Sequence, residues 1–231
     1  MKNRSQNPVD HVGPYRVVHM SKTIDPKSER RRCKLNRHQA VVQGVTDFQT
    51  DIDIVSHLGT HVEAPYHHGS LEKDVTAYHP SYFLGRGILL NLESCGPNEL
   101  ISRTALEVAD RDRVRQDVVV ILDSNYHHEP FVVSENDRRP HLSREAAEWF
   151  VMKKIKAVAF GDGICIETDM EQCNACHDIM LANDVLFIEV IQNIDKLNAE
   201  IFCVTYLPIP IKGIDSSPVN MVAIEGIPGF C

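Results

Sequence analysis

Apolar residues recur along the chain in runs of four to six positions, separated by polar and turn-forming residues. Several of these runs are continuous rather than alternating, which is typical of strands that are buried on both faces. We predict strands over residues 15–19, 41–45, 52–55, 87–92, 118–122, 157–160, 186–191, 202–206 and 219–224.

Helical periodicity is clear in three other segments. Ser102 and Ser143 each precede residues that are apolar at helical spacing, and serine is a preferred N-cap residue. We predict helices over residues 102–109, 143–155 and roughly 171–182. Strands and helices that alternate in this way predict an α/β or α+β fold, and we expect one domain over residues 1–231.

Composition narrows the class of protein. The chain has 231 residues, of which 43% are hydrophobic and 24% charged, as in ordinary globular proteins. A net charge of −8 argues against a general nucleic-acid or anionic-membrane binder. The basic run RRRCK at 30–34 is therefore interpreted as a solvated loop, with an anion-binding patch as the alternative.

Location and redox state follow from two further features. No segment approaches the ~20 apolar residues that cross a bilayer, and the first eight residues lack the apolar core of a signal peptide. We expect a cytoplasmic protein. Its seven cysteines are scattered and odd in number, which favours reduced, mostly buried thiols over a disulfide framework.

Metal-ligand side chains cluster in one short segment, HLGTHVEAPYH at 57–67. It contains three imidazoles and one carboxylate, His57, His61, His67 and Glu63. Imidazole and carboxylate together suit Zn²⁺ or a similar divalent ion, and such sites commonly leave one position open for water. A histidine-rich surface loop without a metal is the alternative.

Geometry restricts the backbone of this segment. On a helix, His57 and His61 would share a face but Glu63 would point away. On a strand all four side chains share a face, yet a straight strand would spread them over roughly 33 Å. The backbone must therefore fold back, and Gly59 and Pro65 make that inexpensive. We predict a bent, non-helical loop at a strand end.

One loop supplies few ligands, so further donors are expected elsewhere. Glu189 lies within the apolar run 186–191, and a carboxylate in a buried strand is costly unless it is paired or bound to metal. A solvent-facing glutamate at a strand end is the alternative. His177 is a weaker candidate, and Asp215 is explained by a plain turn.

A second motif, Cys173-Asn-Ala-Cys176-His177, matches the haem-attachment pattern CxxCH. Neither an export signal, nor a thioredoxin-type position at the start of a helix, nor a second CxxC for a zinc ribbon accompanies it. We therefore disfavour a haem or redox function.

Four segments resemble the cyclase and kynurenine formamidase superfamily, which also contains the isatin hydrolases. The segment 57–67 matches its signature H-x-G-T-H-x-D-x-P-x-H, with Glu63 in place of aspartate. The segments 140–149, 186–197 and 207–219 resemble three further family blocks in the family's order. The chain departs from the family pattern at 123–128 and 161–166, carries Asn220 where many members have arginine, and lacks an N-terminal tryptophan.

The resemblance implies a fold of mixed β-sheet layers or a barrel-like sheet with helices outside, and a homo-oligomer, a dimer or tetramer. It implies one or two divalent ions, Zn²⁺ or Mn²⁺. By this resemblance, His57, His61 and Glu63 hold one ion, Glu63, His177 and Glu189 help to hold a second, and His67 is the catalytic acid and base. The twelve-residue step from His177 to Glu189 also matches the family spacing.

The leading hypothesis is a metal-dependent hydrolase that opens an amide, a cyclic amide or imide, or a lactone of a small molecule with a metal-activated water. One alternative is a cyclase or dehydratase that uses the same site. The other is a non-catalytic metal-binding protein on the same scaffold.

Overall fold

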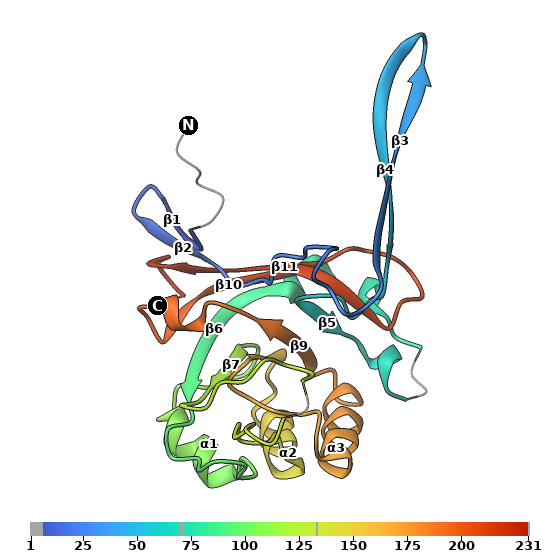
Figure 1. The fold of residues 1–231 in the computed structure, drawn as a ribbon. Coiled ribbons are helices and arrows are strands. Elements are labelled where there is room, and N and C mark those ends of the chain that lie inside the picture. The colour runs from blue at the N-terminus through green and yellow to red at the C-terminus, as the bar shows by residue number, and fades with distance from the viewer. Residues whose placement is uncertain (1–6, 70–71, 133, 231) are drawn as a thin grey trace.

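A sheet that closes into a ring dominates the computed structural model of the chain (Figure 1). The structure describes residues 7–69, 72–132 and 134–230. The ring has the order β11-β10-β6-β7-β8-β9-β5, and β5 pairs with both β9 and β11 to close it. These strands are β5 (His61–Glu63), β6 (Leu84–Asn91), β7 (Val119–Asp123), β8 (Ala157–Gly161), β9 (Leu186–Ile191), β10 (Ile201–Pro208) and β11 (Ser216–Glu225).

The parallel part of the ring, from β6 to β9, is covered by helices. Parallel neighbours need a long crossover connection, and here each crossover contains one helix on the outside of the ring (Figure 1). The helices are α1 (Arg103–Asp110), α2 (Arg144–Lys153) and α3 (Met170–Leu181). Ser102, Ser143 and Asp169 cap them, each accepting a hydrogen bond from a backbone N–H in the first turn.

Strand residues alternate between two apolar cores. Val119 and Ile121 of β7 point into the ring, where they pack with residues of the other strands. Val120 and Leu122 point outward and pack with the helices, including Trp149 of α2. Because both faces of these strands are buried, their sequence is a continuous apolar run rather than an alternating one.

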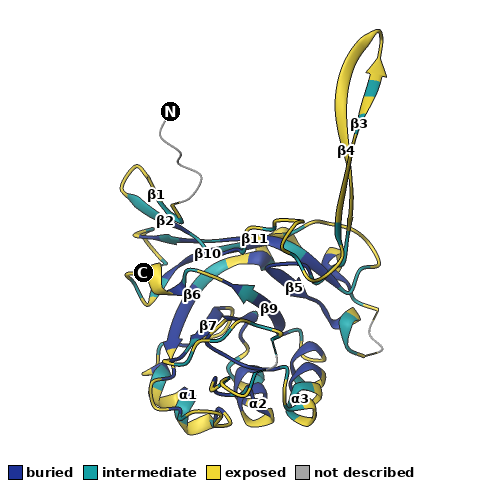
Figure 2. Ribbon diagram, in the orientation of Figure 1, coloured by how far each residue is buried: buried dark blue, intermediate teal, exposed yellow. Residues whose placement is uncertain are grey.

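Two hairpins lie outside this ring. The first, β1 (Val9–Val12) with β2 (Tyr15–His19), extends the sheet from β11. The second, β3 (Cys33–Val42) with β4 (Val45–Ile54), forms a separate two-stranded sheet that projects from the body of the molecule (Figure 1). Figure 2 shows that its residues are exposed along nearly its whole length. We refer to residues 33–54 as the arm.

The structure confirms the α/β class with a barrel-like sheet and outer helices. The predicted strand at 41–45 is wrong, because Gln43 and Gly44 have positive φ angles and form the turn between β3 and β4. The strands β1 and β5, and most of β3, were not predicted. Within the described ranges, no helix has the length and apolar character needed to cross a bilayer. The described cysteines are free, and Cys231 lies outside the described residues.

The close approach of β8 and β9 gives a stability prediction. A Cβ atom on Gly161 would lie 2.1 Å from the carbonyl oxygen of Ile191, so Gly161→Ala must displace one strand. We expect it to lower the free energy of unfolding by about 1–3 kcal/mol. In the matched control Gly85→Ala, the nearest atoms would lie at 3.6 Å, and the change should stay within about 0.5 kcal/mol. Urea unfolding measures both, and equal stability of the two variants would contradict this packing.

Candidate metal centre

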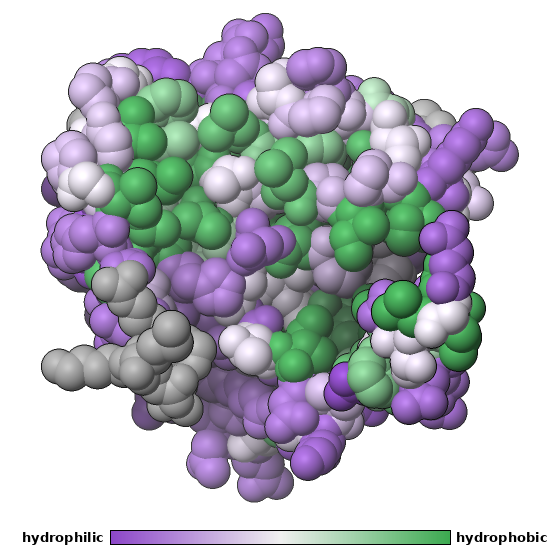
Figure 3. Space-filling view, turned by 90° about the horizontal axis from the view of Figure 1, so that it is seen from above, coloured by the Kyte–Doolittle hydropathy of each residue, from purple (hydrophilic) through white to green (hydrophobic). Residues whose placement is uncertain are grey.

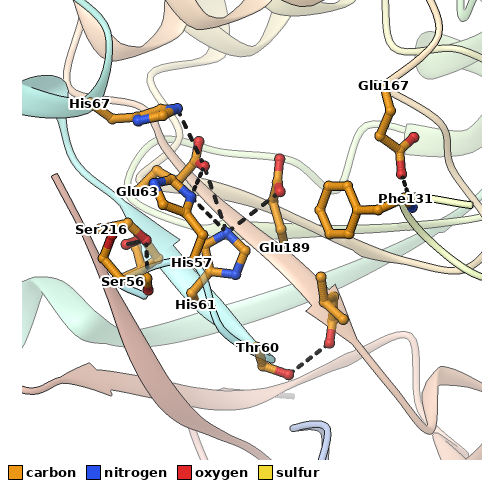
Figure 4. Close-up of polar contacts among 12 residues, drawn as sticks. Ser56, His57, Thr60, His61, Glu63, His67, Phe131, Glu167, Glu189 and Ser216 are labelled. Carbon is orange, nitrogen blue, oxygen red and sulfur yellow. Dashed lines mark hydrogen bonds and ion pairs between the residues drawn. The ribbon is translucent and has the colours of Figure 1, made fainter. Parts of the chain in front are cut away.

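The loop before β5 turns sharply, and this turn brings two histidines together. Gly59 has φ +64°, and a Cβ atom there would lie 2.9 Å from Ile24 Cγ1, so glycine is needed at this position. Thr60 fixes the loop, because its hydroxyl donates to the Val190 carbonyl at 2.7 Å (Figure 4). Across the turn, His57 Nδ1 lies 3.3 Å from His61 Nε2.

The register of β5 decides which side chains face outward. Val62 points into the ring, so His61 and Glu63 point to the opposite side. Glu189 of β9 pairs with His61 in the antiparallel register and lies on the same side, where it is buried. Next to it, Val190 has φ +60°, an unusual conformation for a β-branched residue that marks a bulge beside the site.

Two further histidines reach the cluster from other elements. His177 comes from α3, and its ring stacks on Phe187 with 4.5 Å between ring centroids and 19° between planes. His67 ends the short 3₁₀ helix Pro65–His67, which turns the chain back after β5. Its Nε2 atom lies 3.6 Å from Glu63 Oε1. The loop 57–67 therefore folds back as predicted, with a strand of three residues inside it.

The donor atoms are spaced as metal ligands are. Glu63 Oε1 lies 2.9 Å from His57 Nδ1 and 3.6 Å from His61 Nε2, and the two nitrogens are 3.3 Å apart (Figure 4). Two ligands of a tetrahedral Zn²⁺, each at about 2.1 Å, lie about 3.4 Å apart. The three atoms can thus bind one ion, and nitrogen and carboxylate donors suit Zn²⁺ or Mn²⁺.

Glu63 also faces a second group of donors through its other oxygen. Its Oε2 atom lies 3.2 Å from His177 Nε2, and ligand atoms of Glu63, His67 and His177 all lie within 4.8 Å of one another. Glu189 Oε2 lies 3.5 Å from His61 Nε2. A carboxylate placed between two groups of imidazoles can bridge two ions.

Hydrogen bonds to the backbone show which ring nitrogen of His61 and of His177 carries the proton. His61 Nδ1–H donates to the Gly59 carbonyl at 2.8 Å, and His177 Nδ1–H donates to the Cys173 carbonyl at 2.7 Å. A carbonyl can only accept, so in the neutral rings the inner nitrogens carry lone pairs that face carboxylate oxygens. This arrangement is repulsive unless a proton or a metal ion lies between them, and it matches the tautomers of metal-binding histidines.

The pKa shifts reflect the same need for a cation. Burial alone would lower the pKa of His177, but hydrogen bonds to Cys173 and Glu63 raise it to about 11. Burial and the charge of Glu63 raise the pKa of Glu189 to about 7. Burial acts to raise the pKa of Glu63, yet hydrogen bonds from the surrounding imidazoles hold it well below its usual range. Positive charge, as protons or metal, is thus stabilised here.

The hydrogen bonds of Asp215 show that one interpretation of the sequence was wrong. We explained it as part of a plain turn, but its Oδ2 atom accepts a hydrogen bond from His57 Nε2 at 2.8 Å and lies 3.3 Å from His67 Nδ1. Ser56 donates to its other oxygen at 2.8 Å. Asp215 thus orients two rings of the cluster, as carboxylates behind metal-binding histidines do. Within the sequence, only its place in the last family block indicated a role.

A cavity of about 640 Å³ opens onto the cluster. Its wall is largely apolar and includes Val55, Phe131, Ile166 and Met170. Arg31 and Arg32 of the basic run also line it, and both are exposed. Arg31 donates to the His57 carbonyl at 2.6 Å, and its guanidinium lies 4.4 Å from the Phe131 ring centroid. Two arginines therefore flank a cavity whose largely apolar wall leads to the donor atoms.

All the side chains predicted for the site lie in this cluster. They are His57, His61, Glu63, His67, His177 and Glu189. Their proximity fulfils the geometric condition for a metal site, while the separate roles of ligand and acid or base remain predictions.

Comparisons with known proteins give one family and a set of related structures. The family model described as Putative cyclase matches residues 12–167. That segment contains the first loop of the cluster, and His177 and Glu189 lie beyond it. No curated protein matches the chain.

Several solved structures share the fold. Isatin hydrolase A from Labrenzia aggregata, bound to benzyl benzoate, has 17% identity and a TM-score of 0.72, with 92% of this chain and 94% of that chain covered. An isatin hydrolase bound to the product analogue thioisatinate has 15% identity and a TM-score of 0.71, with 93% and 94% covered. A predicted metal-dependent hydrolase from Bacillus stearothermophilus has 18% identity and a TM-score of 0.64, with 92% and 99% covered.

The position of Asp215 predicts a measurable effect on metal affinity. Asp215→Ala removes the acceptor that orients His57, so we expect affinity for Zn²⁺ or Mn²⁺ to fall about 10–100-fold in competition with a chelator. Asp178→Ala is the matched control, because Asp178 accepts a hydrogen bond from His68 at 2.7 Å instead. Unchanged affinity in the first variant, or an equal loss in both, would show that Asp215 has no orienting role.

Proposed function

The chain belongs to the Putative cyclase family, and we propose that it is a metal-dependent hydrolase of a small molecule. The expected reaction is cleavage of an amide, a cyclic amide or imide, or a lactone. The observation that carries the proposal is the set of three donor atoms, from His57, His61 and Glu63, spaced for one divalent ion beside an open cavity. A purely structural site is normally closed by a fourth protein ligand.

In the proposed reaction, a bound ion would activate water and the carbonyl group, and a side chain of the protein would transfer the proton. A divalent ion held by these donors would lower the pKa of a water molecule toward about 7 and polarise a carbonyl group. His67 lies at the cavity, half-buried, and we assign it the proton transfer from the water to the leaving nitrogen or oxygen. Burial, with His57 and His177 nearby, lowers the pKa of His67, which favours the neutral ring that a general base requires.

The cavity supports an apolar, cyclic substrate. Phe131 offers a flat aromatic surface and Ile166 an aliphatic one, and the donor side chains of the cluster line the same cavity. The related isatin hydrolases, with benzyl benzoate or thioisatinate bound, have the same fold. Isatin-like cyclic amides and aryl formamides are therefore the first substrates to test.

Several finer points are part of this proposal. We assign Zn²⁺ or Mn²⁺ as the ion, one or two per chain, with Glu63 and Glu189 able to bridge a pair. We also propose that residues 1–231 act as one hydrolase domain, that the protein is cytoplasmic, and that it is a homo-oligomer. A cyclase or dehydratase would use the same donors without net hydrolysis, and a non-catalytic metal-binding protein would not need His67.

Three single variants test the division of roles. His61→Ala should lose bound metal and turnover together, because it removes a ligand atom. His67→Ala should keep its metal but lose turnover about 10²–10⁴-fold, the usual contribution of positioned acid–base transfer. His68→Ala, whose ring contacts Asp178 instead, should keep both. Elemental analysis with steady-state kinetics measures each, and equal metal loss in the first two variants would refute these roles.

A substrate panel distinguishes the candidate functions. We expect protein loaded with Zn²⁺ or Mn²⁺ to release carboxylate from at least one formanilide, cyclic imide or lactone, and a chelator to abolish the release. Conversion without carboxylate release would favour the cyclase. Stoichiometric metal with no turnover of any activated amide or ester would favour the non-catalytic protein.

A further inference from the structure

The basic run leads from the body of the molecule into the arm. Figure 3 shows hydrophilic and apolar patches spread over the face from which the arm rises, so exposure alone does not distinguish this run. The contacts of its side chains do. Arg30 lies 3.9 Å from Glu129 and Arg32 lies 3.0 Å from Asp53, so both have a carboxylate beside them. Arg31, between the two, forms no ion pair with any carboxylate in the described part of the chain.

Arg31 is nevertheless held in place on two sides. It donates to the carbonyl of His57 at 2.6 Å, and its guanidinium lies 4.4 Å from the ring centroid of Phe131. The bond to His57 places the guanidinium one residue's length from a candidate metal ligand, at the wall of the same cavity. A guanidinium has five N–H groups, and the His57 carbonyl is its one acceptor among the residues that the structure describes. Donors therefore remain free on a fixed cation.

Phe131, on which the guanidinium lies, is anchored in turn. Its backbone has φ +61°, which is unusual for a bulky residue and persists only where the surrounding structure enforces it. Its N–H donates to Glu167 at 2.9 Å (Figure 4), and Glu167 lies 3.4 Å from Arg139, which is only 1% exposed. A buried arginine thus fixes, through Glu167, the residue that keeps Arg31 at the cavity wall.

The carboxylates that line the cavity already have other partners. Glu63 and Glu189 face the imidazoles of the metal cluster. Glu167 faces Arg139 instead. Arg31 is therefore a cation fixed at a largely apolar wall, and no carboxylate of the described residues that line this cavity is paired with it. A ligand can supply the missing anion.

We propose that Arg31 binds a carboxylate group of the substrate, remote from the bond that is cleaved, so that the molecule hydrolysed at the metal centre is an acid. A guanidinium matches the two oxygens of a carboxylate with two parallel hydrogen bonds, and such charge-assisted pairs are stronger than neutral ones. One unpaired guanidinium suits one negative charge. The ring of Phe131 and the apolar wall would contact the rest of the molecule, which favours an aromatic acid. This inference rests on the proposed function, because it assumes that the cavity binds the molecule that is hydrolysed.

Matched formanilides with and without a carboxylate test the proposal. The substrates are formanilide and the ortho, meta and para isomers of formamidobenzoate, offered to the full chain loaded with Zn²⁺ or Mn²⁺. We expect kcat/KM to be about 10–100-fold higher for at least one formamidobenzoate than for formanilide. In Arg31→Gln this ratio should fall to about one, while kcat/KM for formanilide stays within about threefold of its original value. Arg31→Lys should keep part of the preference, because the charge remains without the planar fork.

Arg30→Gln is the matched control. It removes the same charge from the neighbouring residue, whose guanidinium faces Glu129 and does not line the large cavity. This variant should keep the full preference for the acid. Circular dichroism verifies that each variant keeps the fold.

A binding measurement makes the test independent of turnover. Naphthalene sulfonate and its neutral counterpart, methylsulfonyl naphthalene, are titrated into the metal-loaded protein and followed by their fluorescence. We expect the sulfonate to bind at least about tenfold more tightly than the sulfone to the natural sequence and to Arg30→Gln. In Arg31→Gln the two probes should bind equally.

The outcomes separate this proposal from the proposed function. A sulfonate preference that depends on Arg31, without turnover of any substrate, would refute hydrolysis but support anion binding at Arg31. Equal binding of the two probes by the natural sequence overturns the proposal, as does a preference that survives in Arg31→Gln. An Arg31→Gln variant that slows formanilide and the acids alike also overturns it, because the guanidinium would then act in the reaction itself.

Discussion

The candidate site depends on one buried carboxylate, that of Glu63. It faces imidazoles from three separate elements, the loop before β5, the turn after it and helix α3. The outer nitrogens of His61 and His177 donate to backbone carbonyls, so the inner nitrogens of the neutral rings direct lone pairs toward carboxylate oxygens. These contacts are stable only with positive charge between the two groups. The need for positive charge, as protons or as a metal ion, therefore follows from the hydrogen-bond pattern, independently of any likeness to other proteins.

The sheet positions that carboxylate and its neighbours. Glu63 and His61 face outward because Val62 fills the ring, and the antiparallel pairing of β5 with β9 brings Glu189 beside them. Helix α3 then covers this side and supplies His177. The site thus lies between the ring and α3, and its residues come from segments more than a hundred positions apart.

Much of this arrangement could be predicted from local sequence. The histidines in 57–67 fall at positions that share one face of a strand, which indicated the first part of the cluster. Glu189 indicated the second part, because a carboxylate inside a buried apolar run is costly unless it has a partner. Asp215 was interpreted as part of a plain turn because its neighbours in the sequence suit one, and its partner His57 is 158 positions away. The predicted strand at 41–45 was wrong because the valines on both sides of Gln43 and Gly44 form one apolar run in the sequence. In the structure these valines belong to two exposed strands joined by a turn.

The strand that closes the ring has only three residues, and two of them are candidate ligands. So short a pairing contributes few hydrogen bonds, and the seam of the barrel is a natural place for local unfolding. An ion shared between β5, β9 and α3 would act as a clamp on this seam, adding about 2.7 kcal/mol to folding stability at a hundredfold excess over its dissociation constant. Removal of the metal would then open the pairing of β5 with β9 and β11 before the rest of the barrel unfolds. Susceptibility to proteolysis would therefore increase when metal is scarce.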